Sequence, residues 1–157
     1  MPELNTILHL THTLMVLSVL AVIAYRDYRT HEIPDLFNLL LLALGLASLA
    51  IYTAPSIANR LLATTVIAAP MLLLATARPG SIGGGDIKLM AAAGILLGLP
   101  RVAQAAAIGI ITAAAYAATL LATGKATPKN HIAFGPPLCL GIATAQLFGD
   151  KIMAMWQ

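Results

Sequence analysis

The sequence has little charge and almost no cysteine. Asp, Glu, Lys and Arg make up 10% of its 157 residues, whereas soluble domains carry about 25%. With 59% hydrophobic residues, the composition predicts an integral membrane protein. The single cysteine, Cys139, excludes a disulfide within the chain and a zinc site built on cysteine pairs. The net charge of +3 comes from scattered basic residues that form no face for nucleic acid.

Six apolar segments are candidates for helices that cross a membrane. A spanning helix needs about 20 mostly apolar residues, and the fourth and sixth segments are short for this. No basic residue precedes Arg26, so we expect the first segment to stay as a mature helix rather than to be removed as a signal peptide. The sequence therefore predicts an all-α membrane bundle in one domain, residues 1–157. The segments cover residues 5–25, 36–52, 57–77, 87–99, 102–122 and 137–148.

The distribution of basic residues predicts how the chain is oriented. Cytoplasmic loops carry an excess of Lys and Arg, and the loops after the first, third and fifth segments are the richer ones. We therefore expect these three loops in the cytoplasm and both termini outside. The richer side holds Arg26, Arg29, Arg78, Lys88, Lys125 and Lys129, and the other side holds Arg60, Arg101 and Lys151.

Four of the six acidic residues fall in two of the expected cytoplasmic loops. Asp27, Glu32 and Asp35 lie in the first, and Asp86 lies in the second. Ionisable groups near hydrocarbon are expensive and are functional candidates by default. Two carboxyl groups that share a proton can activate water for attack on a peptide carbonyl. Asp27 and Asp86 are the candidate pair, while Glu32 and Asp35 are interpreted as ordinary loop acids.

Both candidate aspartates have simpler explanations. Asp86 could be the N-cap of the helix that follows it, and Asp27 could be an interface charge in an arginine-rich turn. A cap needs at most one glycine, however, and three glycines at 83–85 precede Asp86. Glycine permits open backbone conformations and the close approach of a second chain, so the run predicts contact with a substrate backbone. His9 and His12 lack a carboxylate or cysteine partner, and we expect no metal site and no cofactor.

Three stretches resemble the motifs of the type IV prepilin peptidases. "DYRTHEIPDLFNLLLL", from Asp27 to Leu42, resembles their first aspartate motif, although Asp35 stands where the family often has Asn. "GGGDIKLMAAAG" resembles the second, Gly-x-Gly-Asp. "FGPPLCLG" resembles the Phe-Gly-Pro segment that opens the last helix, with Ala133 in place of a common Pro. The residues expected to bind substrate are Gly83, Gly84, Gly85, Lys88, Phe134, Gly135 and Pro136.

The resemblance implies a multi-pass aspartic endopeptidase of the bacterial cytoplasmic (inner) membrane, with Asp27 and Asp86 as catalytic residues. Such enzymes remove the short basic leader from prepilins or pilin-like proteins at the cytoplasmic face, and they serve pilus assembly indirectly. Long members also N-methylate the new terminus through an N-terminal region that contains cysteine pairs. This sequence starts with an apolar segment, so it resembles the short branch of tight-adherence (Flp-type) pilus systems, and we expect no methylation.

Two other functions use the same aspartates. A small transporter or channel subunit would hold them in an ion path near the bilayer midplane, beside broken helices. An intramembrane aspartic protease of other substrates would place Asp86 more deeply. Because both aspartates lie at segment ends, the sequence favours a leader peptidase over these alternatives.

Overall fold

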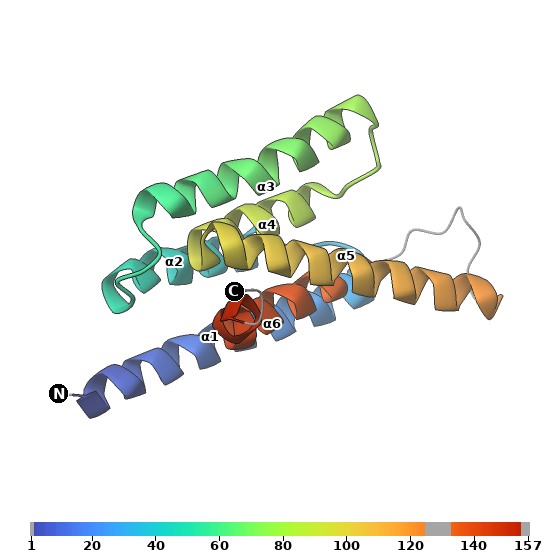
Figure 1. Ribbon diagram of the computed structural model, residues 1–157. Helices are drawn as coiled ribbons and strands as arrows, with labels where there is room; N and C mark the ends of the chain where they lie inside the picture. The colour runs from blue at the N-terminus through green and yellow to red at the C-terminus, as the bar shows by residue number, and fades with distance from the viewer. Residues whose placement is uncertain (1, 125–132, 155–157) are drawn as a thin grey trace.

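The computed structural model describes residues 2–124 and 133–154, and these ranges fold into six α-helices with no strand (Figure 1). The lysines at 125 and 129, which contributed to the predicted orientation, lie outside the described residues. The helices are α1 (Pro2–Thr30), α2 (Asp35–Ile51), α3 (Ile57–Ala77), α4 (Gly84–Leu97), α5 (Leu99–Ala122) and α6 (Gly135–Ala154).

The six predicted segments are confirmed as helices, although the ends of two were wrong. The bounds of α3 match the prediction, and those of α2, α4 and α5 differ from it by one to three residues. α1 continues past residue 25 to Thr30, because Arg, Asp and Tyr are acceptable in a helix although they end the apolar stretch. Asp27 therefore lies in a helix rather than in a loop. α6 also extends beyond the apolar residues 137–148, at both ends.

Three helices within the described residues are long and apolar enough to cross a membrane: Glu3–Thr30, Ile57–Ala77 and Leu99–Ala122. This agrees with the membrane protein that the composition predicts. α2 is a shorter apolar helix, and α4 has 14 residues. That all six helices cross the membrane stays a prediction.

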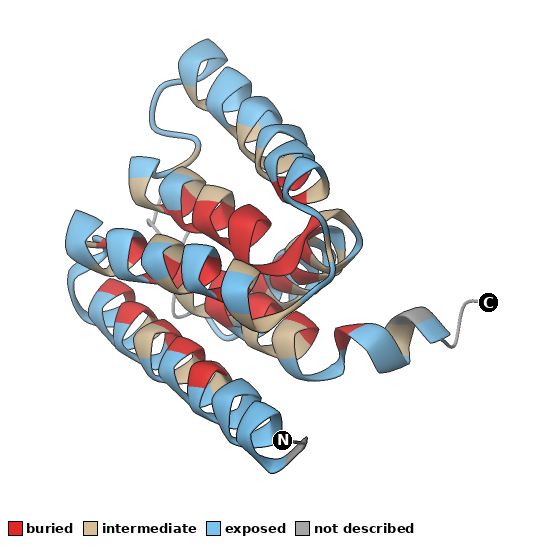
Figure 2. Cartoon of the chain, turned by 90° about the vertical axis from the view of Figure 1, so that its left-hand side faces the viewer, coloured by how far each residue is buried: buried red, intermediate tan, exposed pale blue. Residues whose placement is uncertain are grey.

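α4 lies at the centre of the bundle, in contact with α2, α3, α5 and α6, while α1 packs against α2 and α6. Nearly all of the second half of α4 is buried (Figure 2). Small residues allow α4 to approach α3 closely, because a Cβ added to Gly94 would lie 2.6 Å from the Thr64 backbone. The alanines and glycines of α5 likewise pack closely against α6, since a Cβ on Gly141 would collide with the Ala105 carbonyl.

A buried arginine, which sequence reasoning missed, joins α2, α3 and α4. Arg60 is 1% exposed, and its Nη1 donates to Ser48 Oγ at 2.6 Å and to the Ile95 carbonyl at 2.6 Å. A further hydrogen bond reaches the Leu96 carbonyl at 3.0 Å. These carbonyls belong to the last turn of α4, where a positive charge is stabilising. Arg60 was counted only among the basic residues of the outer side, and it is instead part of the core.

Candidate active site

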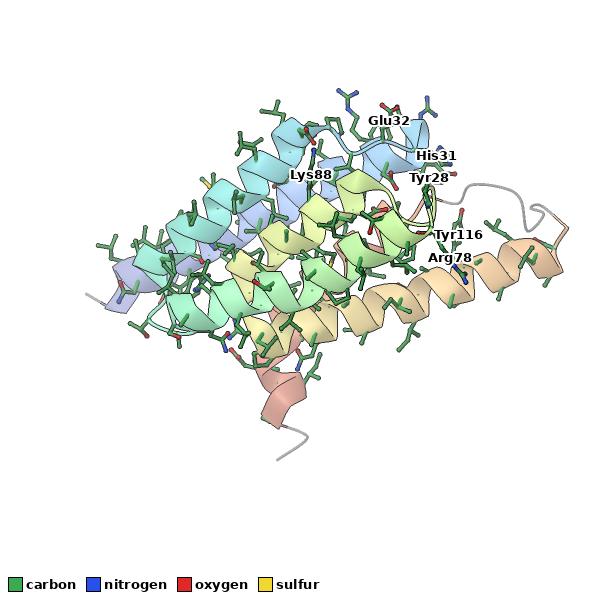
Figure 3. The ribbon with its side chains drawn as sticks, turned by 90° about the horizontal axis from the view of Figure 1, so that it is seen from above. Tyr28, His31, Glu32, Arg78, Lys88 and Tyr116 are labelled. Carbon is green, nitrogen blue, oxygen red and sulfur yellow. The ribbon has the colours of Figure 1, made fainter. Side chains whose placement is uncertain are left out.

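The two candidate aspartates come from distant segments to one cavity. Asp27 is 6% exposed near the end of α1, and Asp86 is 9% exposed in the first turn of α4. Both line a cavity of about 620 Å³. Figure 3 shows that Tyr28, His31 and Glu32 lie at the same end of the bundle as Arg78 and Tyr116. The loops after the first and third segments thus lie at one end, as the orientation prediction requires.

Asp27 is held in place from two directions. Its backbone carbonyl accepts a hydrogen bond of 2.8 Å from the N–H of His31, which adopts a left-handed conformation with φ of 55° just after α1 ends. Its side-chain Oδ2 accepts a hydrogen bond of 2.8 Å from the N–H of Gly135, the first residue of α6. A helix N-terminus offers free N–H groups and partial positive charge, so this contact stabilises negative charge on Asp27.

Asp86 occupies the third position of α4 and is not its N-cap, although its carboxylate accepts a hydrogen bond from the backbone of the N-cap residue. The N-cap is Gly83, and a hydrogen bond from its backbone to the Asp86 carboxylate lowers the pKa of that group. Burial and then the negative charge of Asp27 outweigh this contact and raise the pKa of Asp86 to about 6. Its Oδ1 is buried and has no hydrogen-bond partner among the described residues. Asp86 therefore has a free acceptor beside a second carboxyl group.

The cavity extends from the aspartates along apolar walls. Val66, Ile67 and Met71 of α3 line it, together with Ala106 and Ile110 of α5. His31 and Ser81 are polar residues that line it together with the two aspartates. Sequence reasoning considered the histidines only as metal ligands, and so missed His31. The described residues contain no group of three or more His, Cys, Asp or Glu side chains that could hold a metal ion.

The glycine run contributes close packing instead of open backbone conformations. Gly84 and Gly85 are helical, and no glycine at 83–85 has a positive φ, so the expected open backbone was wrong. A Cβ on Gly85 would lie 2.9 Å from the Ile33 Cβ, and one on Gly83 would lie 3.0 Å from Asp86 Oδ2. Around Gly84 there is open space. Gly85 thus lets α4 approach the segment that precedes α2.

The other residues expected to bind substrate lie in different surroundings. Phe134 lines the aspartate cavity beside Gly83, whereas Pro136 lines a neighbouring cavity of about 440 Å³ with Tyr28 and Tyr116. Lys88 lies on the surface and contacts the Asp35 carboxylate at 2.7 and 2.9 Å. Asp35 is therefore paired and exposed, outside the cavity that holds Asp27 and Asp86. Substrate contact by these residues stays a prediction.

The fold and this site define a helical membrane protein with two buried carboxyl groups beside one cavity. Residues 14–118, about two thirds of the chain, match the model of the type IV leader peptidase family. The chain belongs to this family, and the matched range includes both Asp27 and Asp86. The predicted resemblance to the prepilin peptidase family is therefore confirmed.

One curated relative shows the same relationship. The chain is 33% identical over 86 residues to a prepilin leader peptidase/N-methyltransferase of Bacillus subtilis (strain 168). The match covers 55% of this chain and 35% of the relative, so the chain spans about a third of the length of that protein. No solved structure matches the chain.

Proposed function

We propose that this protein is an aspartic endopeptidase that removes the leader peptide from prepilin-like substrates, with Asp27 and Asp86 as its catalytic pair. The observation that carries the proposal is the meeting of these two buried carboxyl groups at one cavity in a member of a leader peptidase family. The proposed setting is the cytoplasmic face of a bacterial inner membrane, crossed several times by the chain. Lipid and the prepilin are its immediate partners, and the pilus assembly system is an indirect one.

The geometry supports different roles for the two carboxyl groups. The Gly135 N–H stabilises negative charge on Asp27, so Asp27 acts as the base that takes a proton from water. Burial and the negative charge of Asp27 raise the pKa of Asp86 to about 6, so Asp86 is assigned the shared proton of the pair and the hydrogen bond to the scissile carbonyl. Hydroxide oxygen adds to the carbonyl carbon. The C–N bond then breaks, and the leaving nitrogen takes a proton from the pair.

The shape of the cavity supports a substrate with one polar and one apolar part. The polar residues accept the leader and water beside the aspartates, while the walls from α3 and α5 accept the start of an apolar helix. This division fits a leader joined to a hydrophobic helix. It does not favour an ion path, because Asp27 lies near the end of α1 and Asp86 lies in the first turn of α4, and neither is at the middle of its helix.

Methylation is the second part of the proposal. The curated relative is named as both a leader peptidase and an N-methyltransferase, and the chain matches 35% of it. We infer that this chain carries out the peptidase reaction alone. Mass spectrometry of the mature substrate checks this, because an unmethylated N-terminus is expected. A methylated terminus formed by the purified protein would contradict it.

Co-expression with a candidate prepilin tests the proposed function. Leader loss, followed by a gel shift, should occur with the wild-type protein and disappear in Asp27→Asn and in Asp86→Asn. Both variants should remain in the membrane fraction. Cleavage that persists in both single variants would exclude the catalytic pair.

A further inference from the structure

The segment at the start of α2 holds the first turn of α4 on both sides of Asp86. Ile33 packs against Gly85, as described above, and Asn38 Nδ2 donates a hydrogen bond of 3.3 Å to the Gly85 carbonyl. On the outer side, Lys88 reaches toward the start of α2 (Figure 3), where it pairs with Asp35. The contacts thus fall on residue 85, just before Asp86, and on residue 88, just after it.

Asn38 is an unusual residue for its position. It interrupts the apolar run of α2 and is 5% exposed. Its Nδ2 makes the long bond to Gly85, while its Oδ1 is buried without a hydrogen-bond partner in the described parts of the chain. A buried amide oxygen without a partner is destabilising. A leucine of similar size would avoid this desolvation, so packing alone does not explain an asparagine here.

The bond from Asn38 acts on the peptide group that leads directly into Asp86. The carbonyl that it contacts belongs to the Gly85–Asp86 peptide, so the bond restricts the rotation of the backbone that carries the carboxyl group. The need for such a contact is greatest in this helix turn, because consecutive glycines fix the backbone poorly. Both side chains of the Asp35–Lys88 pair are exposed, so this pair contributes less to the restraint of the Asp86 backbone.

We propose that Asn38 is a positioning residue, which orients Asp86 toward Asp27 through the Gly85 carbonyl at the expense of stability. The proposal rests on the proposed function, since it assumes that Asp86 reacts. Asn38 touches neither Asp27 nor the cavity that the two aspartates line, and it acts only through the backbone of α4.

Asn38→Leu is the variant that tests this role. With purified protein and a synthetic peptide that spans a prepilin leader and the start of its helix, kcat should fall roughly ten- to a hundredfold, as expected for a misplaced catalytic group. KM should change less than about twofold, because the walls of the cavity are intact. The midpoint of thermal unfolding should stay the same or rise, since the unpaired oxygen is removed.

Ser48→Ala is the matched control. Ser48 is another buried polar residue of α2, and it contacts Arg60 at the end of α4 that is farther from the aspartates. This variant should have a lower unfolding midpoint and a kcat within about twofold of wild type, because the loss of the Ser48 hydroxyl affects packing rather than the geometry of the site.

The measurements distinguish a positioning role of Asn38, a merely structural role of Asn38, and failure of the proposed function. A wild-type kcat in Asn38→Leu would overturn the positioning role. A fall in kcat that is accompanied by a lower midpoint of thermal unfolding would overturn it as well. An equal fall of kcat in Ser48→Ala would also overturn it, because the removal of any buried polar group from α2 would then lower kcat in the same way. Failure of the proposed function is seen separately, as cleavage that does not depend on Asp27 and Asp86.

Discussion

The N–H of Gly135 donates a hydrogen bond of 2.8 Å to Asp27 Oδ2, and this bond joins two residues that are 108 positions apart. It brings the start of α6 onto the carboxyl group near the end of α1. Gly135 was expected to contact the substrate, whereas the structure places it against a candidate catalytic residue. The Phe-Gly-Pro segment therefore has a physical reason for its glycine, since a side chain would occupy the space of the Asp27 carboxylate.

Gly135→Ala should abolish most leader cleavage. An added Cβ would lie 2.7 Å from Asp27 Oδ2, and the displaced carboxylate should lower kcat roughly a hundredfold. Gly149→Ala, on the same helix, is the control, because its Cβ would meet mainly the flexible Arg101 side chain at 3.0 Å. Steady-state cleavage of a prepilin peptide measures both variants. Equal activity of the two would mean that the Gly135 contact has no role in catalysis.

Asp86→Asn should stabilise the protein at neutral and alkaline pH. The folded chain binds the Asp86 proton more tightly than the unfolded chain, since its pKa is raised from 3.8 to about 6. Stability contributed by this group is therefore present at low pH and is lost as the pH rises from about 4 to 6. The amide avoids this loss, on the order of 2–3 kcal/mol above pH 7.

Thermal unfolding in detergent at pH 8 and pH 4 measures this difference. The Asn variant should unfold at a higher temperature than wild type at pH 8, and the two should converge at pH 4. An advantage of equal size at both values would show that the charge of Asp86 is not the cause.

Gly84→Ala separates a structural role of the glycine run from contact with substrate. No atom lies within 4 Å of a Cβ added at Gly84, and alanine favours a helix over glycine by about 1 kcal/mol. The variant should fold at least as stably as wild type. If substrate approaches this backbone as the sequence predicts, KM for the peptide should rise several-fold. An unchanged KM would restrict the role of the run to helix packing.

Asp35→Asn should retain cleavage within a few-fold of wild type. Asp35 is exposed and pairs with Lys88 outside the aspartate cavity, and exposed ion pairs contribute about 0–1 kcal/mol. Glu32→Gln should be similarly mild, because Glu32 is exposed. The gel-shift assay in cells is sufficient for both. An inactive Asp35→Asn would mean that Asp35, and not Asp27, is the first catalytic aspartate.

The sequence predicted the helices well because apolar length is a local property. The α3 bounds matched, and the two aspartates chosen at the ends of predicted segments line one cavity, while their catalytic role stays a prediction. Helix ends that continue beyond the apolar residues, as at Thr30, were missed because hydropathy falls before helix propensity does. Predicting helix ends of this kind requires the geometry of the helix cap, which here is the left-handed backbone conformation of His31.

The supporting residues could not be predicted, because each acts through a partner far away in the chain. Asn38 was hidden in the run "DLFNLLLL", and only its bond to Gly85, 47 positions away, gives it a role. Arg60 was counted only toward the orientation of the chain, because nothing nearby in the sequence shows the α4 carbonyls that it contacts. A polar residue inside an apolar segment was the one available signal for both.

The buried hydrogen bonds of Arg60 join one half of α3 to α4. Among the described residues, the side-chain hydrogen bonds between α3 and α4 come from Arg60 and from Thr64, both in the half of α3 that is farther from the aspartates. The other half of α3 forms the apolar wall of the cavity, facing α5. Arg60 therefore joins α3 to the last turn of α4 at the end of this helix pair that is remote from the aspartates, while the α3 side chains that line the cavity contribute apolar surface to it.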